Sequence, residues 1–287
     1  MSWTIEGKNV VITGGNSGIG LATAQELARR GARVMITARD ETKGSTAVDA
    51  VREASGSDVE AGILDLSRLE SVREFAARYV AEHDRLDVLI NNAGTMSGSR
   101  RETPDGYEWT FGVNHLGPFL LTGLLTDLLV RSAPARIINV SSENHRSARN
   151  GLDFDDLHMT SGYSAGKAYA ASKMANVLFT VELDRRLRDR GVVARALHPG
   201  VVATSFGKGP EGSRIMGTVM TLLKPFLRKP AKGATASVHL ATADDAALSA
   251  GLYWLDEAPK DPSAHAVDPD AAARLWEESE HLVGWSG

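Results

Sequence analysis

A tyrosine and a lysine four residues apart, Tyr169 and Lys173, are well suited to acid–base chemistry. In a helix, residues at this spacing share one face, so the ammonium group can lie beside the phenol. A free tyrosine titrates near ~10, too high for efficient proton exchange at neutral pH, and a neighbouring positive charge lowers that pKa. The pair therefore predicts a catalytic acid/base, Tyr169, whose pKa is lowered by Lys173.

A second pair with the same spacing, Tyr163 and Lys167, competes for this role. Gly162 and Gly166 flank Tyr163, and each glycine weakens a helix by about 1 kcal/mol. Tyr169, in contrast, opens a long run with helical spacing. We therefore expect Tyr163 to line the substrate cleft rather than to transfer the proton.

A glycine-rich turn follows the first apolar run of the chain, residues 10–12. Its glycines fall where a tight turn and close approach of a phosphate leave no room for side chains. Alone the signal is weak, because an ordinary strand-to-helix turn has a similar sequence, but its position in the first βα unit strengthens it. The turn predicts a pyrophosphate site at Gly14, Asn16, Ser17, Gly18, Ile19 and Gly20.

The second predicted strand ends in Ala38, Arg39 and Asp40. Dinucleotide-binding folds place an acid here for a free ribose 2′-hydroxyl, or an arginine for a 2′-phosphate. Counting from Gly20 puts Ala38 at the ribose and leaves Arg39 to pair with phosphate, so the pattern favours NADP over NAD. Lys43 either adds a second charge or is a solvated lysine in the first turn of a helix.

The elements that must position these residues alternate along the chain. Five short runs rich in Val and Ile are typical of buried parallel strands, at residues 10–12, 34–36, 88–90, 137–140 and 192–197. Helical spacing follows at residues 21–28 and 69–79, the second after a possible Ser67 cap. This alternation predicts one α/β domain over residues 1–287, a doubly wound parallel sheet with helices on both faces and a crevice beyond the strands' carboxyl ends.

Composition excludes several other classes of protein. The net charge of −4 without a basic run argues against a nucleic-acid partner, and the absence of cysteine excludes disulfides and thiolate metal sites. No histidines pair at i and i+4 as a helical zinc motif requires, so we expect no metal. Neither a signal pattern nor eighteen consecutive apolar residues occur, so we expect a cytoplasmic protein without a transmembrane segment.

Three motifs together resemble the short-chain dehydrogenase/reductase family: the glycine-rich turn, residues 91–94 (Asn-Asn-Ala-Gly) and residues 169–173 (Tyr-Ala-Ala-Ser-Lys). The resemblance runs nearly end to end. Residues 113–117, 198–200 and 275–279 are most similar to its retinol-dehydrogenase-like branch, which acts mainly on lipophilic carbonyls and alcohols. It implies a Rossmann fold and a homodimer or homotetramer.

The resemblance also implies roles for individual residues. Ser142, rather than Ser141, would donate a hydrogen bond to the substrate oxygen. Asn114 would hold a water beside Lys173 through its backbone carbonyl, in a helix kink. Besides Tyr169 and Lys173, further cofactor contacts are implied for Asp65, Leu66, Asn92, Ala93, Gly94, Pro199, Gly200, Val202 and Thr204.

The leading hypothesis is hydride transfer between NADP(H) and a carbonyl or alcohol, with Tyr169 moving the proton. One alternative is a catalytically silent NADP-binding regulatory or interaction protein, because this fold also serves regulators. Another is an epimerase or lyase that leaves the cofactor unchanged over a cycle. Net NADPH consumption distinguishes the leading hypothesis from both.

Residues 205–232 form the one stretch whose composition shifts. Its apolar residues are too numerous for an idle surface loop, and its lysines and arginines form a basic edge. Because it follows Thr204 directly, we expect it to close over a lipophilic substrate as a lid. A membrane-surface helix is the alternative.

Overall fold

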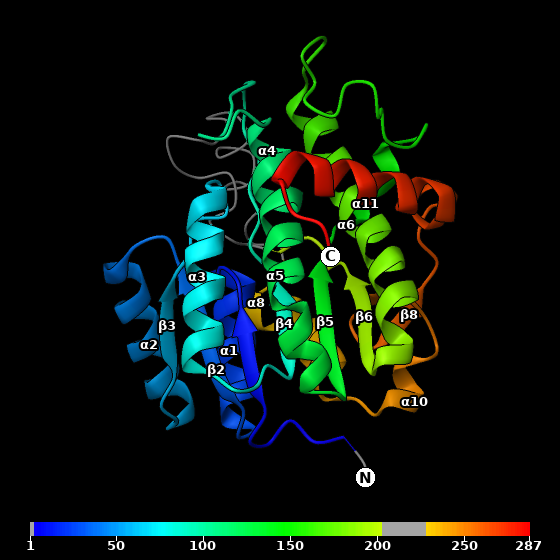
Figure 1. The fold of residues 1–287 in the computed structure, drawn as a ribbon. Helices are drawn as coiled ribbons and strands as arrows, with labels where there is room; N and C mark the ends of the chain where they lie inside the picture. The colour runs from blue at the N-terminus through cyan, green and yellow to red at the C-terminus, as the bar shows by residue number, and fades with distance from the viewer. Residues whose placement is uncertain (1–2, 203–227) are drawn as a thin grey trace.

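The computed structural model describes residues 3–202 and 228–287 and contains an eight-stranded sheet in the order β3-β2-β1-β4-β5-β6-β7-β8 (Figure 1). The strands through β7 run parallel, and β8 pairs antiparallel with β7. Their bounds are β1 (Asn9–Ile12), β2 (Arg33–Ala38), β3 (Glu60–Ile63), β4 (Val88–Asn91), β5 (Ala135–Val140), β6 (Val192–Leu197), β7 (Tyr253–Leu255) and β8 (Ala258–Lys260).

All five strands predicted from the apolar runs are present, and the doubly wound α/β architecture is confirmed. The strands outside those runs are β3, β7 and β8. Both edge strands, β3 and β8, carry exposed residues, so neither has the continuous apolar run of a buried strand. Strand β8 is the one antiparallel strand of this sheet in the described residues, because the tight turn at Asp256 and Glu257 returns the chain directly as a hairpin.

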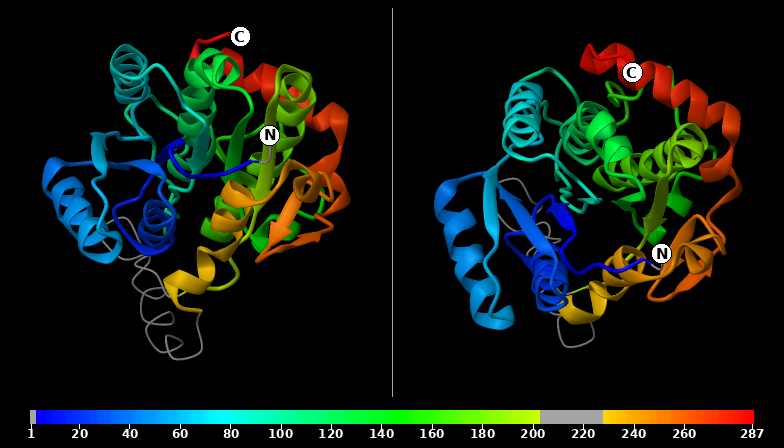
Figure 2. Two further views of the ribbon diagram at one scale, coloured as in Figure 1. Left: turned by 90° about the horizontal axis from the view of Figure 1, so that it is seen from below. Right: turned by 60° about the horizontal axis from the view of Figure 1, so that its bottom comes forward.

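Helices cover both faces of the sheet (Figure 2). One face carries α3 (Leu69–Glu82), α5 (Gly117–Arg131), α6 (Ala165–Leu187) and α11 (Pro269–Val283); the other carries α1 (Gly18–Arg29), α2 (Glu41–Ser55) and α9 (Thr235–Thr242). Along β1, Val11 packs on the first face, whereas Val10 and Ile12 pack on the second. The strands are thus buried on both sides, as their unbroken apolar sequences require.

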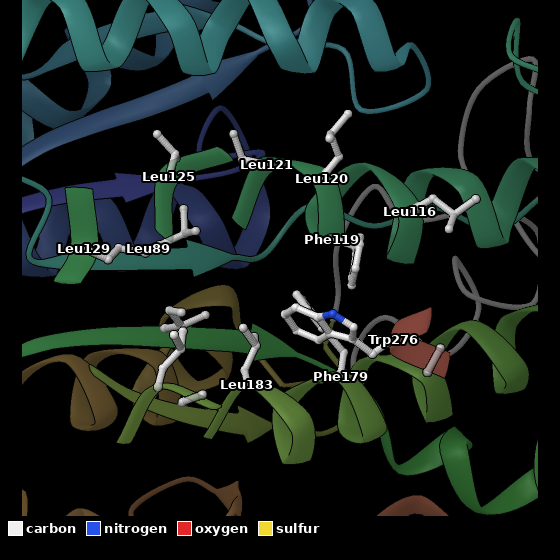
Figure 3. Packing of buried hydrophobic residues seen from close by; sticks show 14 of the residues in the cluster. Leu89, Leu116, Phe119, Leu120, Leu121, Leu125, Leu129, Phe179, Leu183 and Trp276 are labelled. Atoms are coloured by element: carbon white, nitrogen blue, oxygen red, sulfur yellow. The ribbon is translucent and has the colours of Figure 1, made fainter. Parts of the chain in front are cut away.

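Aromatic side chains from three helices fill the first face. Figure 3 shows Phe119 of α5, Phe179 of α6 and Trp276 of α11 in contact. The ring of Phe119 lies 5.2 Å from that of Phe179 and 5.0 Å from that of Trp276, centroid to centroid. Trp276 belongs to one of the branch motifs, and this packing gives it a structural role: it holds α11 against α5 and α6.

Short elements complete the described chain: α4 (Trp109–Phe111), the π-helical turn η1 (Gly112–Leu116), the 3-10 helices η2 (Glu143–Ser147), η3 (Arg188–Arg190) and η5 (Ala264–Val267), α8 (Pro230–Gly233) and α10 (Asp245–Leu248). The cap expected at Ser67 is wrong, because α3 begins at Leu69 and the Ser67 hydroxyl donates to Asp65. Asp105, from a distant loop, accepts the Leu69 amide instead, at 2.9 Å.

One helical stretch in the described residues, Trp109–Arg131, has the length and apolar character of a membrane span, with a hydropathy of 1.3. In this fold, however, 67% of its apolar window is buried inside the protein. Such burial is what a core helix of a sheet-based domain requires.

Thr204 and most of the predicted lid, residues 205–227, lie outside the described residues. At the two ends of this gap, Val202 and Arg228 form a parallel β-bridge, and the Arg228 amide donates to the Val201 carbonyl at 2.9 Å. The described end of the predicted lid leads into α8, which packs against α1.

Candidate active site

The glycine-rich turn lies at the carboxyl end of β1, where the strand order reverses between β1 and β4. Gly14 and Gly18 have positive φ angles of 63° and 55°. A Cβ atom on Gly20 would lie only 2.5 Å from the Asn92 side chain and from the Gly14 carbonyl. Glycine is therefore required here, and the amides at the start of α1, where Ser17 is the N-cap, are arranged to hold a pyrophosphate. Asn16 and Ile19 lie in the same turn, partly exposed.

The segment after β4 fastens this turn in place. Thr13 Oγ1 accepts the amides of Asn92 and Ala93, each at 3.0 Å, and Asn92 Nδ2 donates to the Thr13 carbonyl at 2.8 Å. Asn91 instead bonds Asn139 on the neighbouring strand. Thr13 was not among the predicted site residues, since a threonine that ends a buried strand carries no distinctive sequence signal.

Arg39 and Asp40, at the end of β2, carry opposite charges, and the sequence left open which of them contacts the cofactor. Ala38 is buried and Arg39 is exposed. Asp40 is the N-cap of α2: its carboxylate accepts the Lys43 amide at 2.9 Å and pairs with Lys43 Nζ at 2.7 Å. These hydrogen bonds from Lys43 lower the pKa of Asp40. Lys43 therefore neutralises Asp40, which favours Arg39 as the residue to recognise a phosphate.

Asp65 and Leu66 follow β3 at the same edge of the sheet, next to Ala38, whose carbonyl accepts the Leu64 amide at 2.9 Å. Asp65 Oδ1 accepts both the amide and the hydroxyl of Ser67, at 3.0 and 2.7 Å. These bonds hold the loop on the adenosine side of the predicted crevice.

Residues from β5 and α6 meet at the centre of the crevice. Lys173 Nζ lies 5.7 Å from the ring centroid of Tyr169 and donates to the Val140 carbonyl at 2.9 Å. Ser142, just beyond β5, shares a hydrogen bond with the Tyr169 side chain. The structure therefore brings Ser142, Tyr169 and Lys173 together, as the sequence predicted.

Burial has the largest effect on the pKa values of Tyr169 and Lys173. Burial raises the pKa of Tyr169 to about 12, although its hydrogen bond with Ser142 acts in the opposite direction. Burial also lowers the pKa of Lys173 to about 8. Desolvation thus favours the neutral form of each group in the protein chain by itself. The lowering expected from Lys173 together with the charge of a bound nicotinamide stays a prediction.

The two adjacent serines after β5 have different roles. The buried Ser141 donates its hydroxyl to the Lys173 carbonyl at 2.7 Å and so ties β5 to α6. Ser142 Oγ accepts the Asn144 amide at 3.2 Å. Because Ser142 Oγ is the acceptor in this bond, its own hydroxyl hydrogen is not used there and can be donated to a substrate oxygen.

Asn114 lies in the π-helical turn η1, which supplies the predicted helix kink. Its side chain bonds both backbone groups of Thr95, at 2.7 and 2.9 Å, and donates to Ser172 Oγ at 2.9 Å. Ser172 Oγ in turn donates to the Tyr169 carbonyl at 2.9 Å. A Cβ atom on Gly94 would lie 3.3 Å from Lys173 Nζ, so Gly94 leaves space beside the ammonium group. Ser172 lies inside the Tyr-Ala-Ala-Ser-Lys motif, but its role was not predicted.

Tyr163 does not share a helical face with Lys167, because α6 begins at Ala165. Gly166 lies inside the helix, so the helix starts earlier than the glycines suggested. The Tyr163 hydroxyl donates to the Ser97 carbonyl at 2.9 Å. The Tyr163 hydroxyl is therefore engaged with the protein backbone.

The turn after β6 closes the crevice. Gly200 has a φ angle of 75°, and a Cβ atom there would lie 2.8 Å from Arg228 Nε. Pro199 precedes it and Val202 is buried. Across residues 3–202 and 228–287, no three His, Cys, Asp or Glu side chains are grouped so that they could hold a metal.

This chain is similar to several known proteins in sequence and in fold. The profile of the family described as short chain dehydrogenase matches residues 8–154. Human retinol dehydrogenase 13 is 46% identical over 98% of this chain and 86% of its own length. A crystal structure of an uncharacterized protein from Mycobacterium paratuberculosis is 35% identical, with a TM-score of 0.75 and coverage of 100% and 99%. A metagenomic short-chain oxidoreductase in complex with NADP is 27% identical, with a TM-score of 0.60 and coverage of 83% and 92%.

Proposed function

The chain belongs to the short-chain dehydrogenase/reductase family and is an oxidoreductase, and we propose that it transfers hydride between NADP(H) and a lipophilic carbonyl or alcohol. The observation that carries this proposal is the meeting of Ser142, Tyr169 and Lys173 beside the glycine-rich turn. Because all three of these polar side chains are present, a catalytically silent regulatory protein is disfavoured.

Four residues of the chain have different roles in the proposed reaction. NADP(H), when bound, supplies or accepts the hydride. Tyr169 donates its proton to the substrate oxygen in reduction and takes it back in oxidation. Ser142 donates a hydrogen bond to the same oxygen and stabilises the charge that develops there. Lys173 places a positive charge beside the phenol, and Asn114 holds Ser172 and thereby the turn of α6 that carries Tyr169.

Three observations support NADP as the cofactor. Asp40 is occupied as a helix cap and by Lys43, so the acidic group that would favour NAD is already neutralised. Arg39, at the adjacent position, is exposed beside the crevice. The similar metagenomic oxidoreductase was crystallised with NADP.

The proposed substrate class is supported by the similar proteins and by the site. Human retinol dehydrogenase 13 is named for a lipophilic alcohol. Val201, in the turn that closes the crevice, exposes 66% of its surface and offers an apolar contact beside the site. Cytoplasmic localisation and a homodimeric or homotetrameric assembly remain predictions from the sequence.

Cofactor titration tests the NADP proposal. We expect NADPH to bind at least about tenfold more tightly than NADH, a difference of roughly 1.4 kcal/mol. Arg39→Leu should remove most of that preference by weakening NADPH alone. Arg52→Leu is the matched control, because it removes an exposed charge of α2 that pairs with Asp49 and Asp58. Equal affinities for the two cofactors in the unaltered protein would overturn the proposal.

A carbonyl panel tests the reaction itself. Retinaldehyde and long-chain aldehydes should consume NADPH, whereas polar sugars should be poor substrates, since burial contributes about 0.8 kcal/mol per methylene. Product formation without net NADPH consumption would instead indicate an epimerase or lyase. NADPH binding without turnover of any carbonyl would indicate the silent alternative.

A further inference from the structure

A buried group of aromatic and histidine rings contacts Ser142 through His145. It consists of His145 on η2, Tyr253 on β7 and His198 after β6. The His145 and Tyr253 ring centroids are 5.1 Å apart, and His198 stacks on Tyr253 at 5.5 Å. His145 is completely buried. The mechanism described above uses none of these rings.

His145 joins Ser142 to a distant part of the chain. Its Nδ1 lies 2.7 Å from the Ser142 carbonyl oxygen, and its Nε2 accepts the backbone amide of Ser263 at 3.1 Å. An amide N–H can only donate, so Nε2 carries no proton. The proton of the neutral ring is therefore on Nδ1, which donates to the Ser142 carbonyl.

A second contact reinforces the same junction. The adjacent Arg146 donates to the Asp261 carbonyl, so two consecutive side chains of η2 hold the segment that leads into η5. The Ser142 carbonyl also accepts the His145 amide, at 3.1 Å. Ser142 thus has its carbonyl fixed from two directions while its Oγ accepts the Asn144 amide.

We propose that His145 is a positioning residue for the reaction: its Nδ1–H fixes the backbone of Ser142 and so directs the Ser142 hydroxyl toward the substrate oxygen. This inference rests on the proposed function, because it assigns Ser142 a hydrogen bond made in the transition state. Misplacing such a donor by ~1 Å can lower the rate about 100-fold.

The surroundings of His145 favour the neutral ring that this role requires. Burial is the main cause that lowers the pKa of His145, and the charge of Arg146 acts in the same direction. The Ser142 carbonyl and the Glu143 carboxylate oppose this shift. The Tyr253 hydroxyl, at 3.4 Å from Nδ1, is a further polar group beside the ring, and His198 also interacts with His145 electrostatically.

The first test replaces His145 with leucine. We expect kcat for carbonyl reduction to fall at least about tenfold, with the Kd for NADPH unchanged, because His145 acts on the serine and not on the glycine-rich turn. His239→Leu is the matched control: it removes another histidine, which lies in α9 and packs on Trp254 of β7. It should leave kcat unchanged.

A double-mutant cycle separates positioning from a general structural role. In a Ser142→Ala background, His145→Leu should lower kcat no further, since the group that His145 directs is already gone. His145→Asn should recover part of the activity, because its amide can donate to the Ser142 carbonyl. Equal losses in both backgrounds, or an asparagine variant no better than leucine, would overturn the proposal.

The cycle also distinguishes failure of this inference from failure of the proposed function. Full carbonyl reductase activity in Ser142→Ala alone would overturn the assigned role of the serine, and His145 with it. Loss of activity in Ser142→Ala together with full activity in His145→Leu would overturn the positioning role alone. Thermal unfolding of each variant identifies any that fail to fold, and in that case the asparagine variant decides.

Discussion

The two ends of strand β5 each lie beside a buried cation, but their surroundings differ. At the amino end, Arg136 bonds two carbonyls at the end of α9, pairs with Asp245 at 2.9 Å and stacks on Trp3 at 3.8 Å. At the carboxyl end, Lys173 donates to the Val140 carbonyl, and the described residues give it no carboxylate partner within ion-pair distance. Arg136 therefore has several acceptors in the protein, whereas Lys173 has few.

This difference separates stability from function. A buried charge with several acceptors holds elements together, and losing it leaves buried carbonyls without a donor. Burial lowers the pKa of both cations, Lys173 to about 8 and Arg136 to about 10, but the ammonium group has few acceptors to offset that cost. We therefore propose that its presence reflects a role in chemistry. By the same comparison, we propose that the reaction takes place at the carboxyl end of β5, whereas Arg136 at the amino end anchors α9 and α10 to the sheet.

The largest expected effect belongs to the carboxyl end. Tyr169→Phe should lower kcat by about 1,000-fold, because the substrate oxygen loses its proton donor. NADPH affinity and the melting temperature should change little. Tyr163→Phe is the control and should retain turnover, since its hydroxyl bonds Ser97. Retained turnover in the Tyr169 variant would transfer the acid role to another residue.

The second prediction sets the two cations against each other. Arg136→Met should lower the free energy of unfolding by about 3 kcal/mol, since buried carbonyls lose their donor, while the Kd for NADPH stays unchanged. Lys173→Met should abolish turnover but leave the free energy of unfolding unchanged or higher at neutral pH. Chemical denaturation of both variants provides the measurement. A Lys173 variant less stable than the Arg136 variant would contradict the comparison.

The smallest effect is a dependence on pH. Because the pKa of Lys173 is lowered to about 8, its ammonium group loses its proton as the pH rises through that value. Carbonyl reduction needs the charged form, so kcat/KM for NADPH should fall about tenfold per pH unit above that point. The folded chain disfavours the charged lysine, so wild type should gain stability relative to Lys173→Met as the pH rises from about 8 toward about 10.4. A flat rate profile would contradict this assignment.

The parts of the fold and of the candidate site that could be predicted from the sequence are those in which a local residue pattern determines both structure and chemistry. The apolar runs located the strands that carry the site, and the spacing of Tyr169 and Lys173 placed both on one turn of α6. The sheet topology and the family were predictable for the same reason. Strands β3, β7 and β8 were not predicted: β3 and β8 are edge strands, which need no continuous apolar run, and β7 spans only three residues.

The features that could not be predicted from the sequence depend on how the folded chain packs. The pKa values of Tyr169 and Lys173 follow from desolvation, which exists only once the chain is folded. The contact between His145 and Ser263 joins residues 118 positions apart, and neither residue belongs to a recognisable motif. The pairing of Lys43 with Asp40 resolved an ambiguity that residue types alone leave open.

The bridge between Val202 and Arg228 has a consequence for protein engineering and for evolution. These two residues already lie side by side, so a segment inserted between them enters and leaves the fold at one place. Lengthening such a segment twofold costs only about 0.6 kcal/mol in loop-closure entropy. The bridge therefore marks a place where relatives can differ in length and sequence while the sheet keeps its register.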